Sequence, residues 1–208
     1  MAEMIDIDDF LPEVLRYSPN ANDLVAERFI RQAARELCER CKLWKETDTI
    51  EITTPEMQGV LTIDGADIVS IEAAKLDDAT LEPKTTGWLD VEYPFWTIDT
   101  TPSGPARYVT QLRPNTVTVV PAVEGTLKAR MVLRPSRTAT TLPSFLLERY
   151  SEEIGRGAAG RILMEPDSEN PQLGLVHAGW FDRRLSRLAI DAVKGQQNAP
   201  LRTRGSYL

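Results

Sequence analysis

The stretch LRPSRTATTLPSFLLERYSEEIGRGAAGRIL, residues 133–163, marks the point where the chain changes its type of secondary structure. Its first residues end a run of β-branched, alternating side chains, which is typical of a strand. From Pro143 onward, apolar side chains recur at helical spacing instead. The segment between is polar, and proline is favoured in the first turn of a helix. We therefore predict a strand that ends near Arg134 and a helix that begins at Leu142 and Pro143.

Before this junction, the chain has the composition of a small β-sheet. Its short segments are rich in β-branched residues and are separated by the turn signals DGAD, RPNT and VEG. The predicted strands are TIEIT (49–53), GVLTI (59–63), DIVSIEAAKL (67–76), ARYVTQL (106–112), NTVTVV (115–120) and TLKARMVLR (126–134). These segments predict an antiparallel β unit, residues 48–142, inserted between helical parts of the chain.

One segment of the β unit, TTGWLDVEYPFWT (85–97), does not alternate and predicts a short helical turn with an aromatic cluster. Its four large aromatic residues are Trp88, Tyr93, Phe95 and Trp96. We expect them to close the end of the sheet; a ligand platform is the alternative interpretation.

Helical patterns flank the β unit on both sides. Residues 1–47 contain a short helix with Pro12 in its first turn and a longer amphipathic helix capped by Asn20 or Asn22. Residues 143–194 contain two helices, the second with Asn170 as its cap, and residues 195–208 form an extended tail. The predicted fold class is α+β: a helical layer built from both chain halves, with the inserted antiparallel β unit and the C-terminal tail.

The glycine-rich motif GRGAAG (155–160) matches G-x-G-x-x-G, but its context differs from that of a dinucleotide site. Such a site lies at a turn from strand to helix, whereas this motif follows a segment of helical periodicity. Each glycine in a helix costs about 1 kcal/mol relative to alanine, so a compensating contact is expected. We predict that Gly155, Gly157 and Gly160 form a helix-packing surface or a subunit interface, and that no cofactor binds there.

No set of residues indicates a catalytic or metal site. Cys38 and Cys41 have the C-x-x-C spacing of a zinc or redox site. Zinc needs four ligands, and beyond these two cysteines the chain has one histidine, His177, and carboxylates. The cysteines also lie late in a helix, on its apolar side. A redox pair would lie at a helix start, where the dipole lowers the thiol pKa. We expect buried, reduced thiols, a packed or surface His177, no metal and no enzymatic activity.

Composition and charge exclude further classes. The 208 residues carry a net charge of −7, which argues against a protein that grips the phosphates of nucleic acid. Residues 172–208 carry +4 and the remainder −11, a polarity that suits different partners at the two ends. No membrane span and no signal peptide are visible, so we expect a soluble protein made in a cytoplasm.

The tail, GQQNAPLRTRGSYL, has few apolar residues and no helical period. It is either a frayed terminus or a segment that orders against a partner. Arg202 and Arg204 alternate with Leu201, Thr203 and Ser206, a pattern that could add as a strand to an exposed sheet edge.

The order of these motifs resembles the head-to-tail adaptor proteins of tailed bacteriophages, the connector subunits beneath the portal. The resemblance covers residues 11–194, and its most specific part is residues 134–160. The motifs that carry it are AARELCE (33–39), GPARYVTQLRPNTVTVVP (104–121), LRPSRTATTLPSFLLERYSEEIGRGAAGRIL (133–163) and NPQ (170–172). In this chain LRPSR stands where the family often has a lysine.

The resemblance implies a virion protein of the neck, assembled in the host cytoplasm as a ring, usually twelve-fold, with no catalytic residues. The helices would pack around the ring, the β unit would face a tail or nozzle protein, and DNA would pass through an acidic lumen without specific binding. The tail would reach the portal protein. The expected portal-binding residues are Leu201, Arg202, Thr203, Arg204, Gly205, Ser206, Tyr207 and Leu208.

Two alternative functions remain open at this point. The first is a tail-tube or tail-completion protein of the same particle, which would assemble on the tail before it meets a capsid. The second is a cell-wall hydrolase, which would need a cleft with two carboxylates of different pKa.

Overall fold

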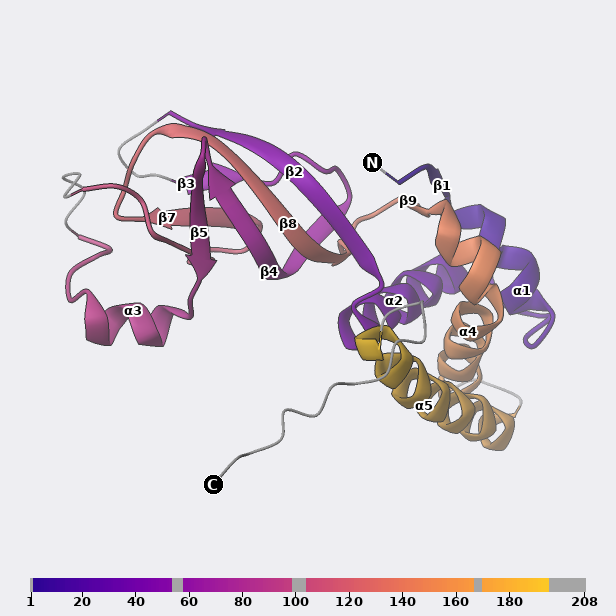
Figure 1. The fold of residues 1–208 in the computed structure, drawn as a ribbon. Coiled ribbons are helices and arrows are strands. Elements are labelled where there is room, and N and C mark those ends of the chain that lie inside the picture. Colours follow the sequence, from indigo (N-terminus) through magenta and orange to yellow (C-terminus); the bar gives the residue numbers. More distant parts are fainter. Residues whose placement is uncertain (1, 54–57, 99–103, 167–169, 195–208) are drawn as a thin grey trace, which may run out of the picture. The chain divides into compact units, whose positions relative to one another are not determined.

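The chain folds into two compact units (Figure 1). The computed structural model describes residues 2–53, 58–98, 104–166 and 170–194. The β unit comprises Met1–Ile5 and Trp44–Ser144, and the helical unit comprises Asp6–Leu43 and Phe145–Leu208. The predicted α+β class is confirmed, since the sheet is mostly antiparallel and helices precede and follow it in the sequence.

A seven-stranded sheet forms the β unit, in the order β2-β8-β4-β5-β6-β7-β3. Neighbouring strands are antiparallel where β2, β8, β4 and β5 pair, whereas β5 and β6 run parallel. The strands are β2 (Trp44–Ile52), β3 (Gln58–Val60), β4 (Ala66–Leu76), β5 (Ala79–Pro83), β6 (Tyr108–Thr110), β7 (Thr116–Val120) and β8 (Gly125–Pro135). The long strand β8 therefore lies between β2 and β4.

The core of the β unit follows from the alternation of its strands. Along β2, the side chains of Trp44, Ile50 and Ile52 are buried while their neighbours in the sequence face outward. In β8, Leu127 and Met131 are buried on the same period of two, as expected for a sheet with one covered face. Trp44 therefore belongs to a strand, and the preceding helix ends at Cys41 because Lys42 adopts a left-handed conformation.

The aromatic segment forms helix α3 (Thr86–Glu92), with the Thr85 hydroxyl accepting the N–H of Trp88 as its cap. The expectation that all four aromatic residues close the sheet is wrong. Trp88 and Tyr93 pack against Tyr108, with ring centroids 5.1 and 5.4 Å apart. Phe95, however, is 71% exposed, and the aliphatic Leu89 is the residue of this segment that fills the core.

A second, two-stranded sheet pairs β1 (Met4–Asp6) with β9 (Thr141–Pro143). The predicted helix start at Leu142 and Pro143 is therefore wrong, and α4 begins one residue later, at Ser144. The Ser144 N–H donates to the Glu3 carbonyl at 2.8 Å. A local proline signal cannot reveal this pairing, because the partner strand is more than 130 residues away in the sequence.

In the part of the helical unit that the structure describes, there are a 3-10 helix, η1, and four α-helices. They are η1 (Ile7–Phe10), α1 (Leu11–Leu15), α2 (Asp23–Cys41), α4 (Ser144–Leu163) and α5 (Pro171–Lys194). The predicted caps are confirmed: Asn22 accepts the N–H of Leu24 at 3.0 Å, and Asn170 accepts the N–H of Leu173 at 3.2 Å.

Ion pairs connect α2, α4 and α5. Arg161 of α4 pairs with Glu36 of α2, which also pairs with Arg40; Arg40 in turn pairs with Asp182 of α5 at 2.6 Å. A second pair is more deeply placed. The Glu153 side chain is 6% exposed, and its carboxylate receives the Nε–H of Arg184 at 2.8 Å.

Removing the guanidinium that pairs with Glu153 should destabilise the helical unit. The Arg184→Met variant leaves a buried carboxylate without its partner, and we expect a loss on the order of 2 kcal/mol in the free energy of unfolding. Urea unfolding measures this loss, with Arg183→Met, at the neighbouring exposed arginine, as the matched control. Equal losses in the two variants would contradict the assigned role of the pair.

Candidate assembly surfaces

The glycines of the GRGAAG motif lie inside α4 and face other helices of the same chain. A Cβ built on Gly155 would lie 2.9 Å from the backbone oxygen of Glu13. One on Gly157 would lie 3.0 Å from the Phe181 ring, and one on Gly160 would lie 2.9 Å from the backbone nitrogen of Ala178. The backbone of α4 thus approaches its neighbours more closely than any side chain would allow.

A fourth glycine, Gly174 of α5, takes part in the same contact and was not among the predicted packing residues. A Cβ on Gly174 would lie 3.0 Å from the carbonyl oxygen of Gly160 and 2.8 Å from Cγ of Met164. Gly160 and Gly174 therefore meet across the α4–α5 contact. The sequence does contain a signal for this contact: Gly174 lies near the start of a strongly predicted helix, where glycine is disfavoured.

Arg156 of α4 lies between two aromatic rings, an arrangement that was not predicted from the sequence. Its guanidinium carbon is 5.0 Å from the ring centroid of Tyr17 and 4.3 Å from that of Trp180. The Tyr17 ring also contacts His177, with centroids 5.1 Å apart. Because cation–π contacts strengthen as the cation loses water, this cluster fixes the turn after α1 against α4 and α5.

The environment of His177 disfavours its charged form. Burial is the main cause that lowers its pKa below the ordinary 6.5, and the nearby Arg156 guanidinium adds to the effect. A neutral imidazole that packs against Tyr17 fits a structural role.

The cysteines occupy the apolar side of α2, as predicted. Cys38 and Cys41 are both buried and free. Burial raises the pKa of Cys41 to about 11 and that of Cys38 still further, so both thiols stay protonated. Within the ranges that the structure describes, no group of three or more His, Cys, Asp or Glu side chains could hold a metal ion.

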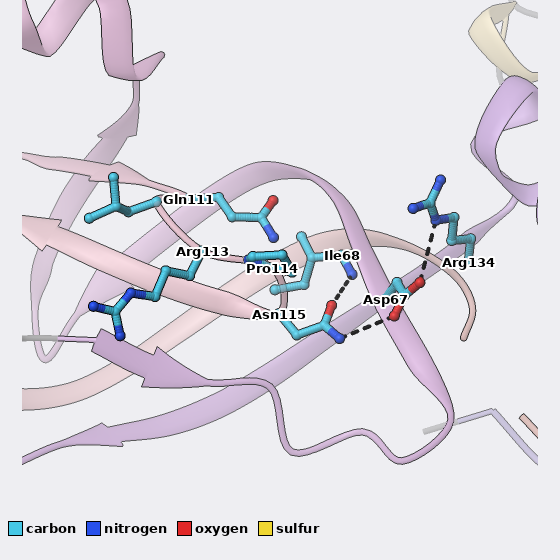
Figure 2. A pocket seen from close by; sticks show the side chains of 8 residues that line it. Asp67, Ile68, Gln111, Arg113, Pro114, Asn115 and Arg134 are labelled. Atoms are coloured by element: carbon cyan, nitrogen blue, oxygen red, sulfur yellow. Dashed lines mark hydrogen bonds and ion pairs between the residues drawn. The ribbon is translucent and has the colours of Figure 1, made fainter. Parts of the chain in front are cut away.

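A cleft of about 340 Å³ opens in the β unit between the start of β4 and the β6–β7 loop (Figure 2). Figure 2 shows Asp67 between Asn115 and Arg134. The Asn115 Nδ2 donates to Asp67 at 3.1 Å, its Oδ1 accepts the Ile68 N–H at 3.0 Å, and Arg134 Nε lies 3.7 Å from Asp67. Among the described residues that line this cleft, Asp67 is the only carboxylate, so they do not supply the carboxylate pair that a cell-wall hydrolase would need.

The surface of α5 that faces away from the helical core combines apolar and basic side chains. We define the α5 outer face as Leu175, Val176, Arg183, Arg187 and Ile190, all of which are exposed. The inward side of the same helix carries the buried Phe181 and Leu185. The predicted portal-binding residues, 201–208, lie outside the described residues. No helix among those described is both long and apolar enough to span a membrane.

The glycine contacts predict opposite effects of two alanine substitutions. Gly160→Ala should destabilise the protein by about 1–3 kcal/mol, because the added methyl group meets backbone atoms of α5 that cannot move independently. Gly179→Ala, in α5, is the control. A Cβ on Gly179 would meet only the Arg183 Nη1, at 3.5 Å. Because alanine has the higher helix propensity, this variant should be more stable by up to about 1 kcal/mol. Thermal and urea unfolding measure both. Stabilisation by Gly160→Ala would contradict the close contact.

The lowered pKa of His177 predicts a pH dependence. As pH falls below the unfolded-state value of about 6.5, the unfolded chain binds a proton at His177 before the folded chain does, so stability decreases. The free energy of unfolding of the wild type should therefore fall more between pH 7 and pH 5 than that of His177→Gln. Identical pH profiles would show that His177 ionises equally in both states.

Comparison with known proteins agrees with the sequence resemblance. The sequence model of the SU10 adaptor protein family matches residues 5–204, which includes nearly all of both units. No curated protein matches the chain. The chain therefore belongs to the SU10 adaptor protein family, a family of phage adaptor proteins.

Proposed function

We propose that this protein forms a ring, with twelve copies as the expected number, that joins the portal protein to a tail or nozzle protein and continues the DNA channel. The observation that carries this proposal is the extent of the family match, residues 5–204, which leaves no room for a separate catalytic domain within the chain. An adaptor acts by presenting binding surfaces, so its function depends on the rigidity of its units.

The packing of the helical unit supplies that rigidity. Backbone contacts at Gly155 and Gly160, the guanidinium between Tyr17 and Trp180, and the buried pair Glu153–Arg184 each connect different helices. A unit held in this way can resist the load of packaged DNA without local unfolding.

The net charge supports passage of DNA without tight binding. Each copy carries −7, so a ring of copies has an acidic average surface. Negative charge around a channel repels phosphates, whereas a basic channel would bind them and slow ejection.

The tail is the proposed portal-binding element. Residues 201–208 contain two arginines and no acid, and they end in Tyr207 and Leu208. In an extended conformation, the arginines would form charge-assisted pairs with acidic groups of the portal, and the last two residues would supply an apolar anchor. The β unit would then contact the tail protein.

Deleting residues 200–208 should separate folding from attachment. We expect the truncated chain to keep a melting temperature within about 1 °C of the full chain, because the deleted residues have few apolar side chains to contribute to a packed core. It should nevertheless fail to remain on DNA-filled heads. Quantitative immunoblotting of purified heads measures the number of copies attached.

Charge substitutions in the full-length tail sharpen this test. Arg202→Glu with Arg204→Glu should weaken attachment in a salt-dependent way, whereas the matched Arg→Lys pair should retain most of it. Normal copy numbers of the truncated chain on filled heads would contradict a portal-binding role of the tail.

A further inference from the structure

The α5 outer face carries charges that no described residue of the chain neutralises. Asp182 and Arg184 of the same helix pair with Arg40 and Glu153. Arg183 and Arg187, by contrast, are exposed and form no ion pair within the described part of the chain.

Apolar side chains accompany these arginines on the same face. Leu175, Val176 and Ile190 are 64%, 61% and 57% exposed. They extend over four turns of α5. Gly179 lies between them and has no side chain, so nothing projects from the helix at the middle of this face. An exposed apolar stripe with a basic centre is typical of a protein contact rather than of a solvated helix face.

Negatively charged side chains occur at the N-terminal start of the helical unit. Asp8 and Asp9 lie exposed in the first turn of η1, and Asp6 before them makes no capping bond with its side chain. None of the three carboxylates has a salt-bridge partner among the described residues. We call Asp6, Asp8 and Asp9 the acidic strip.

The two charged sets lie at different places on the helical unit. The acidic strip precedes α1, which meets α4 at Gly155, whereas α5 meets α4 at Gly160. Tyr17, which follows α1, contacts α5 at His177, a buried residue that is not part of the α5 outer face. One copy can therefore use both sets at once, each toward a different neighbour.

We propose that the α5 outer face of one copy binds the acidic strip of the next copy, and that this contact joins the helical units around the ring. The inference rests on the proposed ring and identifies its contact surfaces. Pairing of α5 with the α5 of another copy would place Arg183 and Arg187 against like charges, which is unfavourable. A contact between two different surfaces repeats from copy to copy and can close into a ring.

Cross-linking in assembled particles tests this contact. Particles are prepared with the double variant Asp9→Cys and Arg183→Cys and treated with a short bismaleimide, which reacts with exposed thiols in preference to the buried, protonated Cys38 and Cys41. We expect a ladder of covalent oligomers on a denaturing gel, because each copy carries both halves of the contact. The control pair, Arg113→Cys with Arg183→Cys, uses an exposed arginine of the β unit and should stay monomeric.

Each result has a defined meaning. A chain that is present in the particles and gives no ladder overturns the inference while the proposed function stands. Dimers from Arg183→Cys alone would show that α5 contacts α5, which also overturns it. If immunoblotting finds no wild-type chain in the particles, the proposed ring fails and the inference fails with it.

A charge exchange provides a second readout. Arg183→Glu with Arg187→Glu should abolish incorporation into particles without changing the melting temperature, since both side chains are exposed. Adding Asp8→Arg and Asp9→Arg in the same chain should restore it. Failure of this second pair to restore incorporation would contradict the proposed pairing of the two surfaces.

Discussion

The close backbone contact between α4 and its neighbouring helices is the constraint on which the helical unit depends. Where Gly160 meets Gly174, neither helix has room for a Cβ. At Gly155, α4 comes equally close to Glu13 of α1, so the close contacts of α4 bring the N-terminal and C-terminal helices into one unit, although the whole β unit separates them in the sequence. The chain must therefore complete its last helices before the first ones are fully packed, and the β unit can be inserted because both of its connections leave the same unit.

Polar interactions then fix the orientation that the glycines permit. The close contact determines how near the helices lie, but a smooth glycine surface would allow them to slide. Arg156 between Tyr17 and Trp180 and the buried pair Glu153–Arg184 prevent such sliding, because their contacts are directional. The outer face of α5 is left with exposed apolar and basic side chains at defined positions, as a protein that assembles through rigid surfaces requires.

Much of this fold could be predicted from the sequence because its signals are local. The caps at Asn22 and Asn170 and the alternation in β8 depend on a few adjacent residues, and the structure confirms them. The pairing of β1 with β9, the contact of Gly174 and the exposure of Phe95 could not be predicted, since each depends on residues distant in the sequence. The arginine between two rings was missed for the same reason. The family could be recognised because the order of its motifs can be read directly from the sequence, whereas individual tertiary contacts cannot.

Imaging the neck of purified particles at subnanometre resolution tests the central claim most directly. We expect a closed ring between portal and tail in which the helical units touch one another, the β units face the tail, and an extended segment from each copy reaches the portal. A neck in which this chain is absent, or in which its copies are attached singly without contacts between helical units, would contradict the account.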